Sequence, residues 1–278
     1  MTVIALAGGL GAPGVTTTAM ALLLTWPLEA GHRVVLAECD PDGGAILPGA
    51  LQGTLGGSHS LRNLALAARQ GQLAEAFWRQ LVDVTDARTR DRLVLPGLYD
   101  PAHAPSMSPV WKPLSAMFAE IEAHAHDVLV DLGRRGAFGP SQVLAQRADL
   151  VLLVAQNTLR GLQNTEVRLA ALREQLGTTT EIGLLLVDAG PFPAADVQRQ
   201  LGAEVVAVLP WRPRESAVLS DGADQPRKFE LSELMRSARS ATTRIRQLVA
   251  TRRARLAVPA LAPGSLEERR SGEVTGAR

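Results

Sequence analysis

The sequence predicts an α/β protein with a mostly parallel, twisted sheet of about seven to eight strands and helices on both of its faces. Seven nearly uninterrupted apolar runs are typical of buried strands, and they occupy 2–7, 33–38, 92–96, 127–132, 149–155, 181–188 and 204–210. Segments with helical spacing separate these runs. Because apolar strands that alternate with helices need cover on both faces, we expect a parallel sheet between two helical layers.

Helical spacing of apolar residues recurs between the strands. It is clear at Leu61, Leu64, Leu66 and Ala68, at Phe77, Trp78 and Leu81, at Leu114, Met117, Phe118 and Ile121, and at Leu162, Val167, Leu169 and Leu172. The proline-rich stretch 99–109 predicts an ordered surface loop. An apolar stripe predicts a last helix over 231–250, so we expect one domain over 1–250. Residues 251–278 are rich in arginine and small residues without periodicity, which predicts a disordered tail.

The chain of 278 residues has the composition of a globular protein, with 46% hydrophobic and 21% charged residues. Its formal net charge of +1 provides no overall field for nucleic acid or an acidic membrane. The single cysteine, Cys39, excludes an internal disulfide and fits a reducing compartment. No apolar stretch reaches the roughly 20 residues of a membrane span. We therefore expect a cytoplasmic protein.

The stretch GGLGAPGVTTTA (8–19) lies between an apolar strand run and an apolar helix run, where a phosphate-binding loop is expected. Its glycines at positions 9, 11 and 14 match the dinucleotide pattern G-x-G-x-x-G. Followed by Val15 and Thr16, the same stretch also matches the P-loop G-x-x-x-x-G-K-[ST], with valine in place of the lysine. Both patterns place backbone N–H groups and a helix N-terminus against phosphate, so the glycines alone leave the choice open.

Three features favour the P-loop. A run of three threonines begins at Thr16, where the helix starts, and a hydroxyl directly after the lysine position is a Mg²⁺ ligand. The run at 127–132 places Asp131 at a strand end. In P-loop proteins, an acid at this position holds Mg²⁺ through water. The strand at 33–38 leads into Glu38 and Asp40, two acids at i and i+2 that point the same way and suit a metal–water site.

In these motifs the chain resembles the MinD/ParA family of deviant-Walker P-loop ATPases. The family's loop K-G-G-x-G-K-[ST]-T aligns with LGAPGVTT (10–17), and its strand end D-x-D-P-x aligns with ECDPD (38–42). Further segments match in order at 92–97, 126–133, 148–164 and 201–222, so the resemblance covers about residues 1–250 and implies a P-loop NTPase fold. A narrower similarity is to the CpaE/TadZ-like branch, which tolerates altered P-loops.

The resemblance implies a site for ATP and Mg²⁺. The residues that it implies in nucleotide binding are Gly9, Gly11, Ala12, Gly14, Val15, Thr16, Thr17, Pro210 and Arg212. The residues that it implies around Mg²⁺ are Thr16, Asp131 and Asp40. Asp40 would orient the attacking water, with Glu38 as the second catalytic carboxylate.

The departures from the family's pattern fall on this same site. Val15 stands at the P-loop lysine, and Leu10 at the signature lysine that reaches across a nucleotide-sandwich dimer. Pro13 removes one loop N–H, Glu38 replaces an aspartate, and Asp188 replaces the asparagine that reads adenine. Loss of a lysine–phosphate contact removes about 1.5–3 kcal/mol of binding free energy unless an arginine compensates. The candidate arginines at strand ends are Arg134, Arg135, Arg160, Arg212 and Arg214.

The sequence thus predicts a MinD/ParA-like nucleotide-binding protein with weak or conditional ATP binding that positions or regulates a larger assembly, secretion or pilus machinery ahead of DNA partition. Weak ATPase activity stays open. We expect a protein partner and a homodimer. Seven arginines between 236 and 255 offer a patch for DNA or a membrane surface, although the solvated back of a packed helix is the favoured interpretation.

Two alternatives remain. One is a pseudo-ATPase scaffold that no longer binds nucleotide. The other is a Rossmann-type NAD(P)-binding oxidoreductase built on the glycine pattern, for which Tyr99, the only tyrosine, has no lysine nearby.

Overall fold

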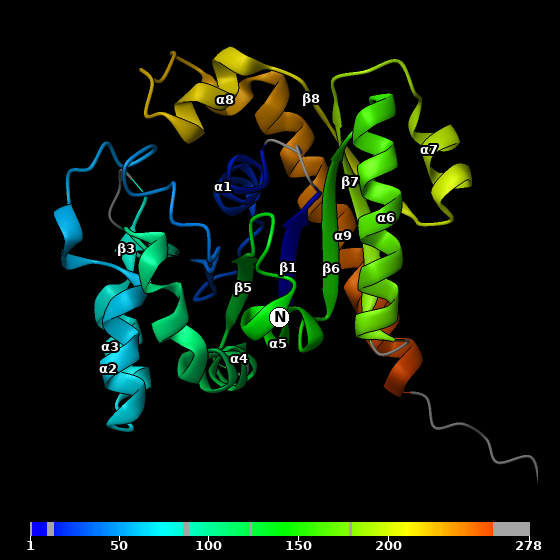
Figure 1. The fold of residues 1–278 in the computed structure, drawn as a ribbon. Helices are drawn as coiled ribbons and strands as arrows, with labels where there is room; N and C mark the ends of the chain where they lie inside the picture. Colours follow the sequence, from blue (N-terminus) through cyan, green and yellow to red (C-terminus); the bar gives the residue numbers. More distant parts are fainter. Residues whose placement is uncertain (1, 10–13, 86–88, 123, 178–179, 258–278) are drawn as a thin grey trace, which may run out of the picture.

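The protein is described by a computed structural model over residues 2–9, 14–85, 89–122, 124–177 and 180–257, and a sheet lies at its centre (Figure 1). Within these residues the sheet has eight strands in the order β3-β4-β2-β5-β1-β6-β7-β8. Seven of the strands are parallel, and the short β3 runs antiparallel to β4 at one edge. The predicted fold class, a mostly parallel sheet of seven to eight strands between helices, is confirmed.

The parallel strands lie where the apolar runs predict them, each boundary within one residue. They are β1 (Val3–Gly8), β2 (Arg33–Glu38), β4 (Arg92–Leu95), β5 (His126–Asp131), β6 (Leu150–Gln156), β7 (Glu181–Asp188) and β8 (Val205–Pro210). The sequence gives no signal for β3 (Val82–Asp83), because two residues are too few to show a period. Since the seven strands are parallel, their carboxyl ends share one edge of the sheet, the usual position of a ligand site in such folds.

Helices cover both faces of the sheet (Figure 1). One face carries α1 (Val15–Thr25), α8 (Pro213–Ser220) and α9 (Glu233–Ala257). The other carries α2 (Leu64–Arg69), α3 (Leu73–Gln80), α4 (Ser108–Glu122), α5 (Gln142–Gln146), α6 (Leu159–Leu176) and α7 (Ala194–Leu201). Ile4 and Leu6 of β1 pack into the first layer, whereas Ala5 and Ala7 pack into the second. This division explains why the strand reads as continuously apolar.

Short 3₁₀ segments occupy several connections. They are η1 (Gly56–Ser58), η2 (Leu61–Asn63), η3 (Pro101–Met107), η4 (Gly139–Ser141) and η5 (Phe229–Leu231). The proline-rich stretch predicted as an ordered loop forms η3 and leads into α4. The Asp100 side chain caps η3 by accepting a hydrogen bond from the N–H of Ala102, at 2.8 Å.

The last helix is longer than the sequence predicts. The apolar stripe predicts a helix over 231–250 and a tail from 251, whereas α9 continues to Ala257. Arg253 explains part of the extension, because its guanidinium pairs with Asp149 at 2.7 Å and ties the added turns to the start of β6. The rest of the predicted tail, 258–278, lies outside the described residues. In the part of the chain that is described, no helix is long and apolar enough to cross a membrane.

Candidate functional site

The connection from β1 to α1 carries the predicted phosphate loop. Gly9 is buried at the end of β1, and Gly14 precedes α1 with φ 98°, a left-handed conformation that favours glycine. The predicted loop residues Gly11 and Ala12, like Leu10 and Pro13, lie outside the described residues. The carbonyl of Gly14 accepts the first helical hydrogen bond, from the N–H of Thr18, at 2.8 Å. The backbone N–H groups of the first turn, which include those of Thr16 and Thr17, therefore have no partner within the helix.

Val15 is part of the apolar core. It is the first residue of α1, its side chain is 5% exposed, and it belongs to the layer formed by α1, α8 and α9. The position at which a P-loop has its lysine is thus occupied by a buried apolar side chain. The next residues, Thr16 and Thr17, are half-buried.

Asp131, the last residue of β5, is fully buried. Its Oδ1 accepts a hydrogen bond from the N–H of Gly133 at 2.8 Å. Within the described residues, its Oδ2 has no hydrogen-bond partner. Burial raises the pKa of Asp131, while the Thr16 hydroxyl, which faces this carboxyl group, and the Gly133 N–H act in the opposite direction. A buried oxygen without a partner is costly unless a ligand satisfies it.

Glu38 ends β2 directly beside Asp131, its partner in the register of the sheet. Both of its oxygens accept backbone hydrogen bonds: Oε1 from Ala45 at 2.5 Å and Ile46 at 3.0 Å, and Oε2 from Gly97 at 2.8 Å. This carboxyl group therefore anchors the loops that follow β2 and β4. Three backbone N–H groups thus donate to the Glu38 carboxyl group, and the catalytic role implied for Glu38 stays a prediction.

Asp40 lies two residues beyond β2, with one oxygen accepting a hydrogen bond from the N–H of Asp42 at 2.9 Å. Its other oxygen packs against Gly133, where a Cβ atom would lie only 1.7 Å away. Gly133 also has φ 53°, so a side chain is disfavoured there for two reasons. The loop after β5 can therefore approach Asp40 closely, which brings Asp40 and Asp131 to one site.

Burial and mutual repulsion act on these carboxyl groups together. Burial, followed by the charge of Asp131, raises the pKa of Glu38 to about 7. Burial is also the main cause that raises the pKa of Asp40 to about 6. Between them, Cys39 is buried with its pKa well above the ordinary value, because its surroundings are apolar and its charged neighbours are acidic. These three acids, Glu38, Asp40 and Asp131, form what we call the acid cluster.

The acid cluster fits a Mg²⁺ ion that is held mainly through water and phosphate. Asp131 offers a buried oxygen without a partner, with the Thr16 hydroxyl facing it and Asp40 close by. Within the described residues, no group of three or more His, Cys, Asp or Glu side chains could hold a metal ion by itself. Mg²⁺ accepts such a site, because it usually keeps several waters and uses one or two carboxylates with substrate phosphates.

On the other side of β1, polar residues gather at the ends of β6, β7 and β8. Asp188 ends β7 and accepts a hydrogen bond from the amide of Asn157 at 2.8 Å. The Asn157 amide oxygen also accepts from Ala189 at 2.8 Å and Gly190 at 2.6 Å. The Asn157 side chain therefore holds the loop that follows β7 in place. Asn157 is not among the predicted site residues, although a polar residue directly after the buried β6 is a signal in the sequence.

Pro210 and Arg212 follow at the end of β8. Pro210 is half-buried and lies opposite Asp188 in the register of the sheet. The Arg212 guanidinium pairs with Glu233 at the start of α9, with Nε 2.9 Å from Oε2. Arg212 is thus already engaged, and its nucleotide contact stays a prediction.

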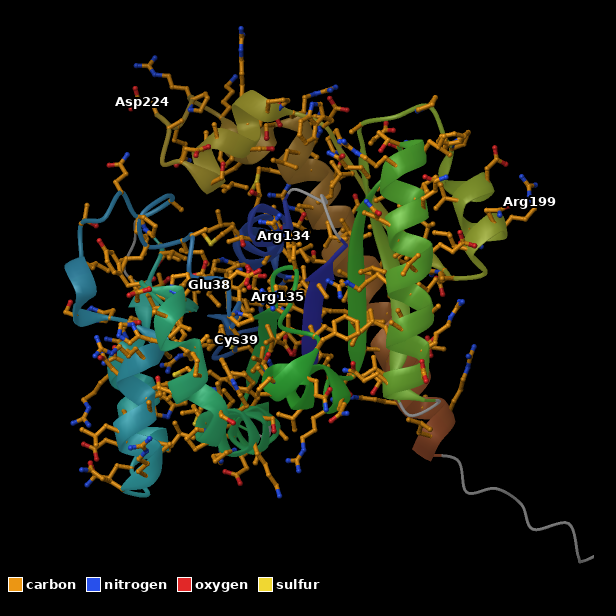
Figure 2. All side chains as sticks on the ribbon, viewed as in Figure 1. Glu38, Cys39, Arg134, Arg135, Arg199 and Asp224 are labelled. Carbon is orange, nitrogen blue, oxygen red and sulfur yellow. The ribbon has the colours of Figure 1, made fainter. Side chains whose placement is uncertain are left out.

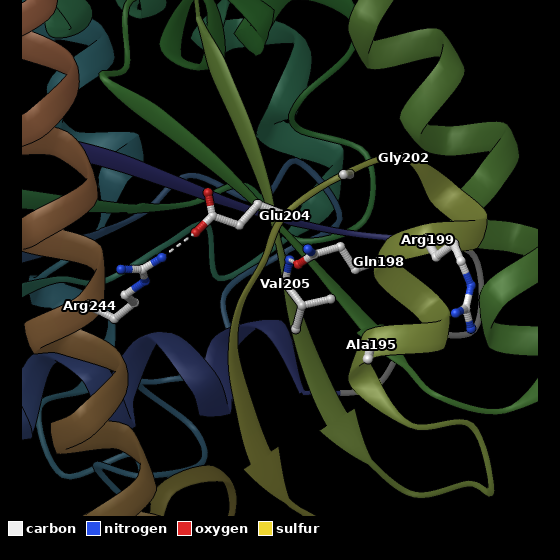
Figure 3. Close-up of a pocket in the computed structure, with 8 residues that line it drawn as sticks. Ala195, Gln198, Arg199, Gly202, Glu204, Val205 and Arg244 are labelled. Carbon is white, nitrogen blue, oxygen red and sulfur yellow. Dashed lines mark hydrogen bonds and ion pairs between the residues drawn. The ribbon is translucent and has the colours of Figure 1, made fainter.

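The arginine-rich α9 and the nearby hollow lie away from the acid cluster. A hollow of about 730 Å³ between α7, β8 and α9 opens beside the beginning of β8, the end opposite to the carboxyl edge (Figure 3). At its wall Arg244 pairs with Glu204 at 2.7 Å. Arg246 similarly pairs with Glu29 at 3.4 Å. These ion pairs reduce the free positive charge of α9, which favours the solvated-face interpretation over a nucleic-acid patch.

Comparison with known proteins identifies the fold. No protein-family model and no curated protein matches the sequence. Solved structures do match, and the chain has the fold of the MinD and ParA ATPases.

Three of these structures show the extent of the similarity. Septum site-determining protein MinD from Pyrococcus horikoshii, complexed with Mg-ADP, has a TM-score of 0.65 at 17% identity over 90% of this chain and 98% of its own. The MinC:MinD cell division protein complex of Aquifex aeolicus matches with a TM-score of 0.65 at 16% identity, over 89% of this chain and 96% of the matched chain. A plasmid partition protein of Borrelia burgdorferi bound to AMPPNP matches with a TM-score of 0.61 at 11% identity, over 89% of this chain and 99% of its own.

Proposed function

We propose that this protein binds ATP with Mg²⁺ at the carboxyl edge of the sheet and uses the bound state to position or regulate a larger assembly through a protein partner. The observation that carries the nucleotide site is the buried Oδ2 atom of Asp131, which has no hydrogen-bond partner among the described residues and belongs to a carboxyl group that the Thr16 hydroxyl faces. A Mg²⁺–phosphate group would satisfy that oxygen. The bound Mg²⁺ would neutralise phosphate charge and orient it.

The strand order supports one orientation of the nucleotide. The acid cluster lies on one side of β1, at the ends of β5 and β2, whereas Asp188 and Pro210 lie on the other, at the ends of β7 and β8. Three strand spacings separate β1 from β8, which is about 14 Å. A nucleotide with its phosphates at the start of α1 would therefore reach Pro210 with its base.

The partner-directed role rests on the structural relatives. MinD of Aquifex aeolicus is seen in complex with MinC, and the Borrelia burgdorferi relative is a plasmid partition protein. A homodimer that forms with ATP–Mg²⁺ is part of the proposal, as is a role at secretion or pilus machinery in the manner of the CpaE/TadZ-like branch.

The buried Val15 favours a second candidate, the pseudo-ATPase scaffold. A valine packed in the core cannot contact phosphate through a charge, so a loop of this kind would be a structural turn. The dinucleotide alternative is disfavoured by the sheet itself, because β5 lies between β1 and β2, whereas the dinucleotide fold places its first two strands side by side.

A thermal-unfolding experiment separates these candidates. ATP–Mg²⁺ at 100 times its dissociation constant should stabilise the protein by about 2.7 kcal/mol, and NADH should have no effect. Thr16→Val should lose the response to ATP–Mg²⁺, while Thr243→Val, on the exposed face of α9, should keep it. No shift at millimolar ATP–Mg²⁺ would support the scaffold, and a shift with NADH alone would support the oxidoreductase. Sedimentation with and without ATP–Mg²⁺ tests the dimer.

A further inference from the structure

We propose that Arg134, in the loop after β5, supplies the positive charge to bound phosphate that Val15 cannot supply. The inference rests on the proposed function, since it names a residue that would hold the phosphates of ATP. It assigns to one arginine the role for which the sequence leaves five candidates.

The backbone places Arg134 next to the phosphate loop. The N–H of Leu132 donates to the carbonyl of Leu6 at 2.9 Å, and the N–H of Gly8 donates to the carbonyl of Gly133 at 2.8 Å. The loop after β5 thus lies directly on the last residue of β1, from which the chain enters the loop toward α1. Arg134 is the next residue after Gly133. Figure 2 labels Arg134 and Arg135 in the loop after β5, and Glu38 at the end of β2.

The Arg134 backbone is held, but its guanidinium is available. Its carbonyl accepts a hydrogen bond from the guanidinium of Arg168 on α6, which fixes the loop to the helical layer. The side chain is exposed and forms no hydrogen bond or ion pair with any other described residue. Gly133, the residue before it, packs against the Asp40 carboxyl group, so the Arg134 backbone lies beside the acid cluster.

The other candidate arginines are engaged or lie elsewhere. Arg135 pairs with Asp42 at 3.5 Å, and Arg212 pairs with Glu233. Arg160 and Arg214 lie in the first turns of α6 and α8, and among the described residues neither adjoins a residue whose backbone is hydrogen-bonded to β1. A guanidinium suits phosphate, because its planar set of N–H donors can contact two oxygens at once.

Calorimetric titration with ATP–Mg²⁺ tests this role. Arg134→Ala should weaken ATP–Mg²⁺ binding by about 10- to 100-fold, the effect of losing a hydrogen bond to a charged group. Arg134→Lys should recover part of the loss. Arg135→Ala is the matched control, an adjacent arginine already paired with Asp42, and it should change the affinity by less than about threefold, as expected for an exposed pair.

The melting temperature of the ligand-free protein gives a readout that separates a phosphate contact from a structural role. Because the Arg134 side chain is exposed, Arg134→Ala should leave that temperature unchanged, whereas ATP–Mg²⁺ affinity falls. If Arg134→Ala binds ATP–Mg²⁺ as tightly as the wild type, or loses ATP–Mg²⁺ affinity in parallel with its melting temperature, the assignment is wrong while the proposed function stands. A wild-type protein that fails to bind ATP–Mg²⁺ would overturn both.

Discussion

At the ends of β2 and β5, the carboxyl groups of Glu38 and Asp131 are buried side by side, whereas at the start of α1 the position expected to carry a cation holds the buried Val15. Burial has opposite effects on the stability of the fold in these two regions. Burying Val15 stabilises the fold, by about 1.5–3 kcal/mol for a fully buried side chain. Burying unpaired carboxylates destabilises it, so they persist where something else requires them.

The contrast separates two functions that a P-loop usually combines. The acid cluster has groups that suit Mg²⁺, namely an Asp131 oxygen without a partner among the described residues and the Thr16 hydroxyl that faces the same carboxyl group. The start of α1 retains the backbone N–H groups of a phosphate site but has no side-chain charge. Under the proposed function, phosphate binding would depend on the metal and on a cation from elsewhere in the chain, and changes on either side of the contrast should have opposite effects on stability and binding.

The largest effect is expected from Val15→Lys. The ammonium would enter the apolar layer of α1, α8 and α9, and the free energy of unfolding of the ligand-free protein should fall by about 3–5 kcal/mol. ATP–Mg²⁺ gives the ammonium a partner, so its binding should tighten by about 1.5–3 kcal/mol. Chemical denaturation and calorimetric titration measure the two effects, with Val15→Met as the apolar control. Unchanged ATP affinity in a folded Val15→Lys variant would show that the start of α1 no longer contacts phosphate.

Asp131→Asn acts on the other side of the contrast. The amide keeps an oxygen for the Gly133 N–H but removes the buried charge. We expect ATP–Mg²⁺ affinity to fall by about a hundredfold, since a Mg²⁺ ligand and its orientation are lost. The ligand-free variant should unfold at a higher denaturant concentration than the wild type, because an uncompensated carboxylate is gone.

The control for Asp131→Asn is Asp42→Asn, which removes a partly exposed acid that already pairs with Arg135. That variant should bind ATP–Mg²⁺ like the wild type. An Asp131→Asn variant that is less stable than the wild type, and yet binds ATP–Mg²⁺ equally well, would show that the acid cluster is structural.

Much of the acid-bearing region could be predicted, and little of the apolar one. Parallel strands end at one edge, so acids after two apolar runs were expected to lie near each other. That Glu38 and Asp131 are direct neighbours depends on β5 lying beside β2, a long-range pairing that no local pattern encodes. The burial of Val15 likewise depends on α8 and α9, which are more than 190 residues away in the sequence.

The contacts that occupy predicted site residues were also beyond local patterns. Glu38 accepts hydrogen bonds from N–H groups at 45, 46 and 97, which meet only when two loops fold back onto β2. Arg212 is held by Glu233, 21 residues further along the chain. A sequence motif gives residue types and spacing, but it does not show which polar groups the rest of the fold has already used.

A smaller effect is expected from pH. Burial raises the pKa of Glu38 from 4.5 to about 7, so between these values the folded protein binds more protons than the unfolded chain, and its stability falls as pH rises. From about pH 5.5 to about pH 8 this group alone should lower the free energy of unfolding by about 2 kcal/mol. Asp40, with a pKa of about 6, acts in the same direction.

Denaturation in the presence of a chelator measures this slope, because bound Mg²⁺ would compensate the charge. Glu38→Gln should flatten the profile, although it also weakens the contact with the Gly97 N–H. Stability that rises over the same pH range would contradict the buried, uncompensated state of the acid cluster.

The smallest effect is expected from Arg212→Ala, which compares the two ends of the carboxyl edge. Arg212 and Glu233 are each 46% exposed, and solvent-exposed pairs contribute about 0–1 kcal/mol, so stability should change little. Because the guanidinium is held by Glu233, ATP–Mg²⁺ affinity should stay within about twofold of the wild type, in contrast to the loss expected for Arg134→Ala. Glu233→Gln releases Arg212 without removing it and serves as the companion variant. If Arg212→Ala instead weakens ATP–Mg²⁺ binding tenfold, the arginine must leave Glu233 for the nucleotide, and the missing cation would come from the end of β8 rather than from the loop after β5.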